Sequence, residues 1–176
     1  MTLFGDISEI PKPGQFVNIK IDGLYLRRPI SVCDTDGKSL TLVYKVVGEG
    51  TEKMSEMSHG GSLDILLPLG NGYDISNGEN SVIIGGGVGV PPMYMLCKRL
   101  LETGKNPIVI LGFNTKDEVF YADKFEKLGV KTIVTTADGS FGKKGFVTDA
   151  LGDIKTYSYF FACGPEPMLK AVCGVS

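Results

Sequence analysis

Val82-Ile83-Ile84-Gly85-Gly86-Gly87-Val88-Gly89-Val90-Pro91-Pro92 is the stretch that decides the fold of this chain. Its three consecutive apolar residues suit a strand that is buried on both faces of a parallel sheet. The glycines that follow predict a tight turn, and Pro91 fits the first turn of a helix that ends near Gly104. The stretch therefore predicts the strand–turn–helix unit of an open α/β sheet.

Three more short apolar runs follow this unit, and stretches with a helical pattern separate them. The runs lie near residues 108–111, 132–135 and 158–162. Together with the first run they predict four parallel strands that are joined by βαβ crossovers. We therefore expect an α/β domain over residues 78–176.

The first 72 residues have a different pattern, in which apolar and polar side chains alternate as in half-buried strands. The alternation covers residues 17–21, 40–47 and 63–67, and residues 34–37 have the composition of a hairpin turn. One short helix is expected over residues 51–57. The fold class that we predict is a small antiparallel β-barrel followed by a parallel-sheet α/β domain.

The overall composition excludes several classes of function. The chain has 176 residues, of which 22% are charged and 43% are hydrophobic, as in a globular protein. Its net charge of -2 lacks the excess of positive charge that binds nucleic acid. The apolar runs are too short to span a membrane. The four cysteines have no metal-ligand spacing, so we expect no metal site and a reducing cytoplasmic location. The single histidine, His59, is interpreted as a surface residue without a catalytic role.

The glycine-rich turn is a candidate site for a phosphate-bearing cofactor. Backbone N–H groups at a helix N-terminus bind phosphate when no side chain blocks them. The residue order differs from the usual Gly-x-Gly-x-x-Gly motif of dinucleotide-binding proteins, because Val90 occupies the position of the third glycine. The alternative is a tight turn that only packs against the sheet. The expected contacts are Gly85, Gly86, Gly87, Gly89 and Pro91.

A second candidate site begins at Arg28-Pro29-Ile30-Ser31. Arginine binds pyrophosphate in a bidentate manner, Pro29 stiffens the backbone, and the Ser31 hydroxyl is a donor for a ring nitrogen such as flavin N5. The alternative is an exposed arginine on an edge strand. Residues 48–51 favour the cofactor interpretation, because they follow a strand, begin a probable helix and so offer a second anion site.

Two segments at the ends of later strands are also candidates. Residues 162–168 end the last parallel strand, where α/β sheets bind ligands, so Cys163 is placed to border a nicotinamide ring. The alternative for a single cysteine is a small buried apolar residue. Residues 136–142 follow the third strand and form either a nucleotide-facing loop or a simple turn.

The order of these motifs resembles the ferredoxin–NADP reductase superfamily. Within it, the chain is most similar to the electron-transfer subunits of class 1B dihydroorotate dehydrogenase, over nearly its whole length. The more specific stretches are Pro-Leu-Gly-Asn-Gly-Tyr (68–73), Gly-Val-Pro-Pro-Met-Tyr (89–94) and Ala-Cys-Gly-Pro-Glu-Pro-Met-Leu-Lys-Ala-Val (162–172).

The resemblance implies an FAD-binding barrel over residues 1–72 and an NAD-binding domain over residues 78–176. It places FAD at Arg28, Pro29, Ile30, Ser31, the strand segment Val43, Tyr44 and Lys45, and Gly50 and Thr51. It places NAD at residues 85–89 and beside Cys163, Gly164 and Pro165. Ser31 and Cys163 are the residues that it puts next to the reacting rings.

The resemblance also implies a partner. In the family, an FMN-containing catalytic subunit oxidises dihydroorotate in a heterotetramer, and electrons cross a [2Fe–2S] cluster to FAD and then to NAD⁺, as part of pyrimidine biosynthesis. Family members carry four cluster cysteines beyond the Cys-Gly-Pro helix, where this chain has only Cys173. We interpret the chain as truncated at both ends and expect at most a diaphorase-like activity from it alone.

Two other interpretations remain open from the residues. One is the NAD(P)H-binding flavin subunit of a sulfide dehydrogenase or transhydrogenase-type complex. The other is a non-catalytic assembly module. Asp117 and Glu118 follow the second parallel strand, and no basic pair does, which favours NAD over NADP.

Overall fold

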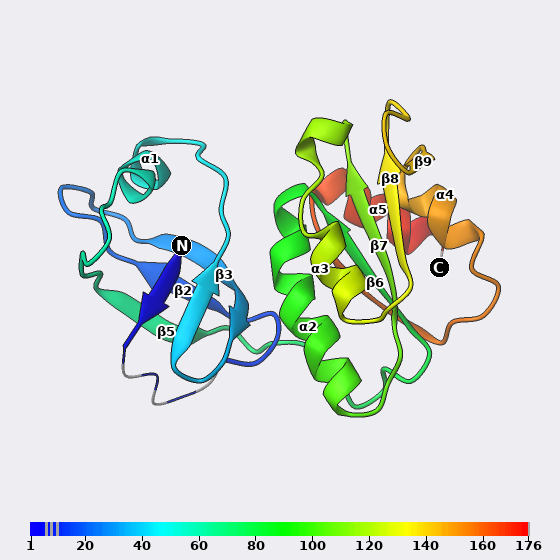
Figure 1. Cartoon of the computed structure of the whole chain (residues 1–176), viewed down its shortest axis with the longest axis horizontal. Coiled ribbons are helices and arrows are strands. Elements are labelled where there is room, and N and C mark those ends of the chain that lie inside the picture. The colour runs from blue at the N-terminus through cyan, green and yellow to red at the C-terminus, as the bar shows by residue number, and fades with distance from the viewer. Residues whose placement is uncertain (6, 8, 10, 176) are drawn as a thin grey trace. The chain divides into compact units, whose positions relative to one another are not determined.

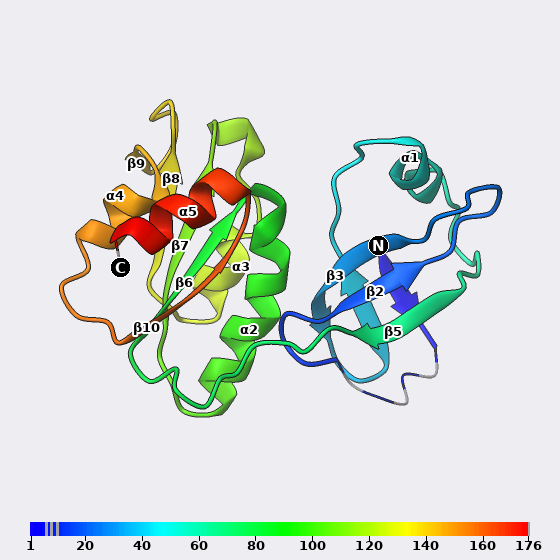
Figure 2. The same ribbon diagram turned by 180° about the vertical axis from the view of Figure 1, so that it is seen from behind.

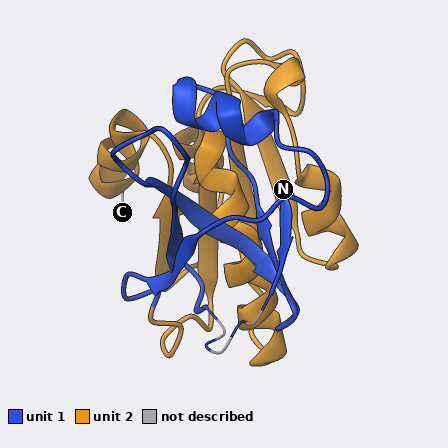
Figure 3. Ribbon diagram, turned by 90° about the vertical axis from the view of Figure 1, so that its left-hand side faces the viewer, with its two compact units in different colours: residues 1–73 blue, residues 74–176 orange. Residues whose placement is uncertain are grey.

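The computed structural model describes residues 1–5, 7, 9 and 11–175. Its contacts divide the chain into two compact units, residues 1–73 and residues 74–176 (Figure 3). Each unit is built on a five-stranded sheet. The first sheet is antiparallel and the second is parallel with helices on both faces, so the predicted fold class is confirmed.

The sheet of the first unit is a half-barrel with the strand order β1-β4-β3-β2-β5 (Figure 1). Its strands are β1 (Thr2–Phe4), β2 (Phe16–Ile19), β3 (Arg28–Thr35), β4 (Ser39–Leu42) and β5 (Ile65–Leu69). Val17, Ile19, Val32 and Leu42 are fully buried between the sheet and the rest of the unit. The alternation in the sequence thus becomes one buried and one more accessible face.

The strand that the alternation predicts over residues 40–47 is too long. Strand β4 ends at Leu42, and residues 43–47 form an extended connection without a ladder partner. Strand β3 pairs with β4 only from Val32 onward, and its earlier residues pair with β2 alone. Val46, which shares a face with Leu40 and Leu42 in the predicted strand, is 50% exposed, so the apolar side of the pattern is not buried there. Val43, Tyr44 and Lys45 therefore lie in a connecting segment and not in a strand.

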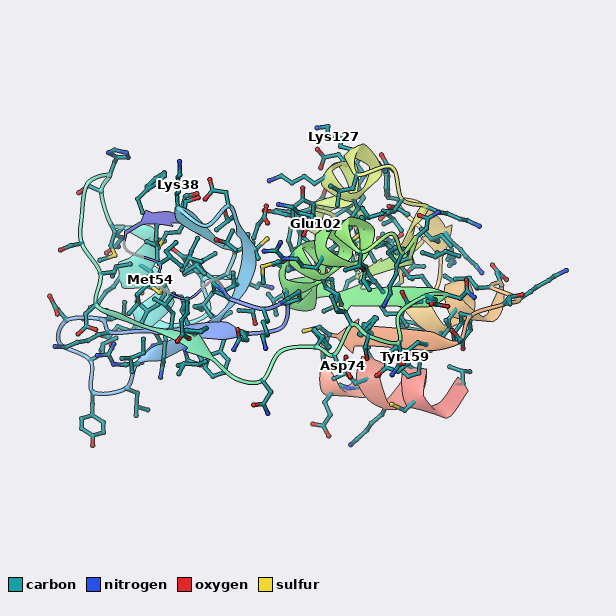
Figure 4. The ribbon with its side chains drawn as sticks, turned by 90° about the horizontal axis from the view of Figure 1, so that it is seen from below. Lys38, Met54, Asp74, Glu102, Lys127 and Tyr159 are labelled. Atoms are coloured by element: carbon teal, nitrogen blue, oxygen red, sulfur yellow. The ribbon has the colours of Figure 1, made fainter. Side chains whose placement is uncertain are left out.

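The short helix that we expect over residues 51–57 is α1 (Glu49–Ser55). Its first turn is held by the hydroxyl of Thr51, which accepts hydrogen bonds from the N–H groups of Val47 (2.9 Å) and Gly48 (3.2 Å). Met54, labelled in Figure 4, is 1% exposed and packs the helix onto the unit. The sequence also predicts one barrel strand over residues 1–6; β1 covers Thr2–Phe4 of it, and residue 6 lies outside the described residues.

The sheet of the second unit has the order β10-β6-β7-β8-β9 and is parallel throughout. Its strands are β6 (Ser81–Gly86), β7 (Ile108–Phe113), β8 (Thr132–Thr136), β9 (Lys143–Lys144) and β10 (Tyr159–Cys163). Every residue of β6 is buried, as a central strand covered on both faces requires. The four apolar runs of the sequence are β6, β7, β8 and β10, and the two-residue β9 was not predicted.

Helices cover both faces of this sheet (Figures 1 and 2). Helices α2 (Val90–Glu102) and α3 (Ala122–Lys127) lie on one face, and α4 (Val147–Gly152) and α5 (Glu166–Val175) lie on the other. One-turn 3₁₀ helices, η1 (Gly87–Gly89) and η2 (Lys116–Glu118), follow β6 and β7. Among the described residues, no helix is long and apolar enough to cross a membrane.

The inner stripe of α2 contains Cys97, which is fully buried. Burial raises the pKa of this thiol from the ordinary 9.0 to about 12. A thiol that ionises at a higher pH in the native state than in the unfolded state stabilises the native state. This contribution is fully present below pH 9 and is lost as the pH rises through the native pKa. High pH is therefore expected to destabilise the protein through this residue.

We expect this loss of stability to be absent from the Cys97→Ala variant. The difference in free energy of unfolding between wild type and variant should shrink by about 1.4 kcal/mol per pH unit between about pH 9 and about pH 12. Urea unfolding at several pH values measures it. The Met95→Ala variant, which removes a buried side chain without an ionisable group from the same helix, should keep the wild-type pH dependence. A constant difference between wild type and Cys97→Ala would contradict the assignment.

Candidate functional site

The glycine-rich turn connects β6 to α2 through η1, and its glycines have two different roles. A side chain at Gly86 would lie 2.4 Å from the sulfur of Met168, and one at Gly89 would lie 2.2 Å from the carbonyl oxygen of Cys163. These positions are glycine because other parts of the unit pack directly against them. Gly87 differs, because a side chain there would meet no atom within 4 Å, and its φ of +51° favours glycine.

The glycine turn and the Cys-Gly-Pro segment lie together in the structure. Strand β10 pairs with β6, so that Cys163 is the partner of Gly85, and Pro165 follows directly at the same edge. The connection after β6 leads to α2 on one face, and the connection after β10 leads to α5 on the other. Such a switch point at the carboxyl ends of parallel strands is where open α/β sheets bind ligands.

A cavity of about 450 Å³ lies at this edge, within the second unit. It is bounded by the carboxyl ends of β6, β7 and β8 and by the first turns of α4 and α5. Its lining includes Gly86, Gly87, Phe113, Asn114, Phe146 and Pro165. The volume is within the range of small-molecule sites, and the lining combines apolar side chains with open backbone at Gly87.

Phe113, Asn114 and Phe146 are lining residues that the sequence interpretation did not identify. Phe113 is the last residue of β7 and Asn114 follows it, and their position at a strand end was the available signal. Phe146 precedes α4 and is 67% exposed, and nothing in its local sequence indicates that it reaches the cavity. Its ring therefore offers a flat apolar surface at the cavity rim.

Glu118 is also part of the cavity lining, whereas Asp117 is not. The Glu118 carboxylate accepts hydrogen bonds from the backbone N–H of Asn114 (3.0 Å) and from its side-chain amide (2.9 Å). These bonds fix a negative charge at the end of β7. The sequence pattern had singled out both acidic residues, and the structure distinguishes between them.

The loop over residues 136–142 is held mainly by bonds within itself. The Thr136 hydroxyl donates to the carbonyl of Phe141 at 2.7 Å, and Asp138 accepts bonds from the backbone and hydroxyl of Ser140. These bonds, with the hydroxyl of Ser140 first, hold the pKa of Asp138 below its ordinary value. None of residues 136–142 lines the cavity, although Thr135 and Gly145 beside them do.

Cys163 contributes backbone packing at the switch point, since its carbonyl oxygen closely approaches Gly89. Its side chain is partly buried, and burial raises the pKa of the thiol, so that it stays protonated at neutral pH. The thiol is not part of the cavity lining. Its predicted position beside a nicotinamide stays a prediction.

In the first unit, Arg28 lies against the start of α1. A side chain at Gly50 would lie 2.1 Å from Nε of Arg28, and the guanidinium also donates to the carbonyl of Leu26. Thr51, which closes the first turn of α1, is 8% exposed. The structure therefore brings together three residues that were predicted from two separate motifs.

The Arg28–Ser31 motif is divided between the two faces of the sheet. In the ladder, Arg28 is the partner of Ile19 and Ile30 that of Val17, whereas Pro29 and Ser31 are the partners of Asn18 and Phe16. Cross-strand partners share a face, so Arg28 and Ile30 lie on the face of the buried residues and Pro29 and Ser31 on the opposite one.

Tyr44 lies after β4, and burial raises the pKa of its phenol.

Comparison with known proteins identifies the family. Residues 83–174 match the family model of the oxidoreductase NAD-binding domain. The electron transfer subunit of dihydroorotate dehydrogenase B (NAD(+)) from Fusobacterium nucleatum is 47% identical over 94% of this chain and 69% of its own length. The chain belongs to this family of electron transfer subunits. The subunit of the same name from Bacillus pumilus is 42% identical over 98% of this chain and 70% of its own length.

Solved structures support the same fold for this electron transfer subunit. The NADH-dependent reduced ferredoxin-NADP oxidoreductase, which was studied for flavin-based electron bifurcation, gives a TM-score of 0.84 at 37% identity, over 93% of this chain and 61% of that chain. The FAD/NAD-binding domain of nitric oxide dioxygenase from Vibrio cholerae gives 0.81 at 21% identity, over 93% of this chain and 78% of that one. The subunit thus has the FAD/NAD-binding fold of the ferredoxin–NADP reductase superfamily.

The part of this subunit that the structure describes has no group of three or more His, Cys, Asp or Glu residues that could hold a metal ion. Cys33 and Cys97 are buried, Cys163 is partly buried and Cys173 is exposed. The chain spans about 70% of the length of the curated relatives that it matches.

Proposed function

We propose that this chain transfers electrons between FAD, bound by residues 1–73, and NAD, bound by residues 74–176. In the whole protein, these electrons would come from dihydroorotate oxidation in an FMN-containing catalytic subunit, through a [2Fe–2S] cluster, and serve pyrimidine biosynthesis. The observation that carries the proposal is the cavity at the switch point, whose lining includes Gly87 and Pro165. The family membership supports the remainder.

The residues at the cavity fit a pyridine dinucleotide. The open backbone at Gly87 admits a phosphate without a steric clash. The space beside Gly86 is occupied by Met168, and the space beside Gly89 is occupied by the carbonyl group of Cys163. The exposed ring of Phe146 suits a base that stacks on it. The fixed carboxylate of Glu118 disfavours an additional phosphate on the ribose, which supports NAD over NADP.

The residues of the first unit fit a flavin dinucleotide. The Arg28 guanidinium, which lies against Gly50, is proposed to bind the pyrophosphate, and the Ser31 hydroxyl, on the opposite face of β3, is proposed to donate to the flavin ring. Bound FAD and NAD supply the redox chemistry, whereas the protein binds and orients them. Pro29, Ile30, Val43, Tyr44, Lys45 and Thr51 are proposed as further contacts of FAD. Gly85, Gly86, Gly89, Pro91, Cys163 and Gly164 are proposed as the walls of the NAD site.

Flavin reduction tests the proposal. The purified protein, reconstituted with FAD, should take up one FAD per chain, and NADH should bleach the flavin absorbance at least about tenfold faster than NADPH, the equivalent of roughly 1.4 kcal/mol. Stopped-flow absorbance at equal coenzyme concentrations measures both rates. If the folded protein takes up no FAD, the enzymatic role fails for this chain and a non-catalytic assembly module is the better description.

A further inference from the structure

Phe146 lines the cavity of the second unit and is 67% exposed, but the backbone on each side of it is held by the sheet. Before it, the N–H of Gly145 donates to the carbonyl of Thr136, at the end of β8, at 3.0 Å. After it, Val147 is 3% exposed and lies so close to β7 that a side chain at Gly112 would be 2.5 Å from its Cγ1. An exposed aromatic side chain is thus mounted on a fixed stretch of backbone.

The backbone of Phe146 itself is fixed by Asp149, in the first turn of α4. The Asp149 carboxylate accepts a hydrogen bond from the N–H of Phe146 at 2.7 Å, and the N–H of Asp149 donates to the carbonyl of Phe146 at 3.0 Å. A carboxylate that reaches back to the residue before a helix is half of a capping box. These bonds hold Phe146 in an extended conformation, with φ −103° and ψ 169°. Because the backbone sets the direction of the Cα–Cβ bond, they also set where the ring begins.

Asp149 is held in turn by its neighbours. It lies on the backbone of Gly145, where a side chain would be 2.5 Å from Oδ2, the carboxylate oxygen that binds Phe146. From β9, the Lys143 ammonium group donates to the carbonyl of Asp149 at 2.7 Å. Asp149 is exposed and is not part of the cavity lining. Its carboxylate can therefore act on a ligand through Phe146 without touching the ligand.

The place of Phe146 along the sheet edge indicates which base would meet its ring. The strand order puts β10 and β8 on opposite sides of the central strands β6 and β7. Cys163, where the nicotinamide is expected, ends β10, whereas Phe146 comes two residues after β9, the partner of β8. Gly87, the proposed phosphate contact, follows β6, between these two ends. A dinucleotide with its nicotinamide at β10 therefore brings its adenine to Phe146.

We propose that Asp149 is a positioning residue of the NAD site, whose carboxylate holds Phe146 so that the ring receives the adenine of the coenzyme. This inference rests on the proposed function, because it assigns a role within the same cavity. A side chain that is already in place loses less conformational freedom when the ligand binds. Stacking of a base on an aromatic ring is strong enough to change an affinity about tenfold.

The Asp149→Ala variant tests the proposal. The dissociation constant for NADH should rise roughly tenfold, because alanine cannot accept the hydrogen bond from Phe146. In competition with NADH, AMP should bind more weakly by the same factor and nicotinamide mononucleotide should bind as it does to the wild type. A general loss of folding would not separate the two halves of the coenzyme in this way. The Asp149→Asn variant should keep the wild-type affinity, since its side-chain oxygen still accepts the bond.

The Phe146→Leu variant removes the ring from an exposed position and leaves the cap of α4 in place. It should reproduce the losses for NADH and AMP. The double variant Phe146→Leu, Asp149→Ala should bind NADH about as weakly as Phe146→Leu alone, because both changes remove the same contact. Additive losses would mean that Asp149 does not act through Phe146.

The Asp123→Ala variant is the matched control. Asp123 is an exposed carboxylate in the first turn of α3, which also has six residues, and it pairs with Lys127. Its removal should leave the affinities for NADH and AMP unchanged. Wild-type NADH affinity in Asp149→Ala or in Phe146→Leu, or equal losses for AMP and nicotinamide mononucleotide, would overturn the inference and leave the proposed function intact. If the folded wild type does not bind NADH, the proposed function fails and the inference fails with it.

Discussion

The Gly89→Ala variant is expected to lower the free energy of unfolding of residues 74–176 by about 3 kcal/mol and to abolish NADH binding. The added methyl group would lie 2.2 Å from the carbonyl oxygen and 2.4 Å from the carbonyl carbon of Cys163. Both atoms belong to backbone that is fixed by the β6–β10 ladder, so the strands must separate to make room. Urea unfolding and calorimetric titration with NADH measure the two effects.

Two other glycine variants separate packing from binding. The Gly174→Ala variant in α5, where a side chain would meet no atom within 4 Å, should raise stability by about 0.5–1 kcal/mol. The Gly87→Ala variant has equal space, but its positive φ costs about 1–2 kcal/mol, and the new methyl group points into the proposed phosphate site. It should reduce NADH affinity while the protein stays folded. Full NADH affinity in Gly89→Ala would contradict the position of the site.

The Arg28→Met variant is expected to raise the dissociation constant for FAD about 10- to 100-fold, because a charged hydrogen bond contributes roughly 1.5–3 kcal/mol. The Gly50→Ala variant should have a similar effect with Arg28 still present, since its methyl group would occupy the place of the Arg28 side chain, 2.1 Å from Nε. Flavin fluorescence during reconstitution measures the affinity. Both variants should unfold like the wild type.

The double variant Arg28→Met, Gly50→Ala makes this test sharper. If Gly50 acts only by leaving room for Arg28, the two changes are not additive, and the double variant should bind FAD about as weakly as Arg28→Met alone. Additive losses would mean that Gly50 contacts FAD independently. Gly5→Ala is the matched control, because Gly5 lies outside the proposed FAD site and a side chain there meets no atom within 4 Å.

Much of the fold could be predicted from the sequence, because the period of the apolar residues differs between the two halves. The uninterrupted runs at residues 82–84 and 108–111 became central strands β6 and β7, and the helix expected at Pro91 begins at Val90. The strand over residues 40–47 was wrong beyond Leu42. Alternation describes which side chains could share a face, but a strand also needs a neighbour to pair with, and that depends on the register of β3.

The site was predicted less completely. Glycine and proline signals are local, so the turn after β6 and the segment after β10 were recognised. Phe146 lines the cavity because it directly precedes α4, whose first turn is also part of the lining, and no local pattern in the sequence predicts that position. Arg28 and Ser31 lie on opposite faces of the sheet because of the register in which β2 pairs with β3. The four residues of the motif alone do not predict this.

The pairing of β10 with β6 has a consequence for how the protein is made. These are the last and the first strand of the second unit, and their contact has the longest sequence separation in that sheet. Contacts of this kind form late, because the chain between them must first be synthesised and collapsed. A nascent chain on the ribosome therefore has no nucleotide pocket until β10 has emerged, and completion of the fold and competence to bind arise in one step.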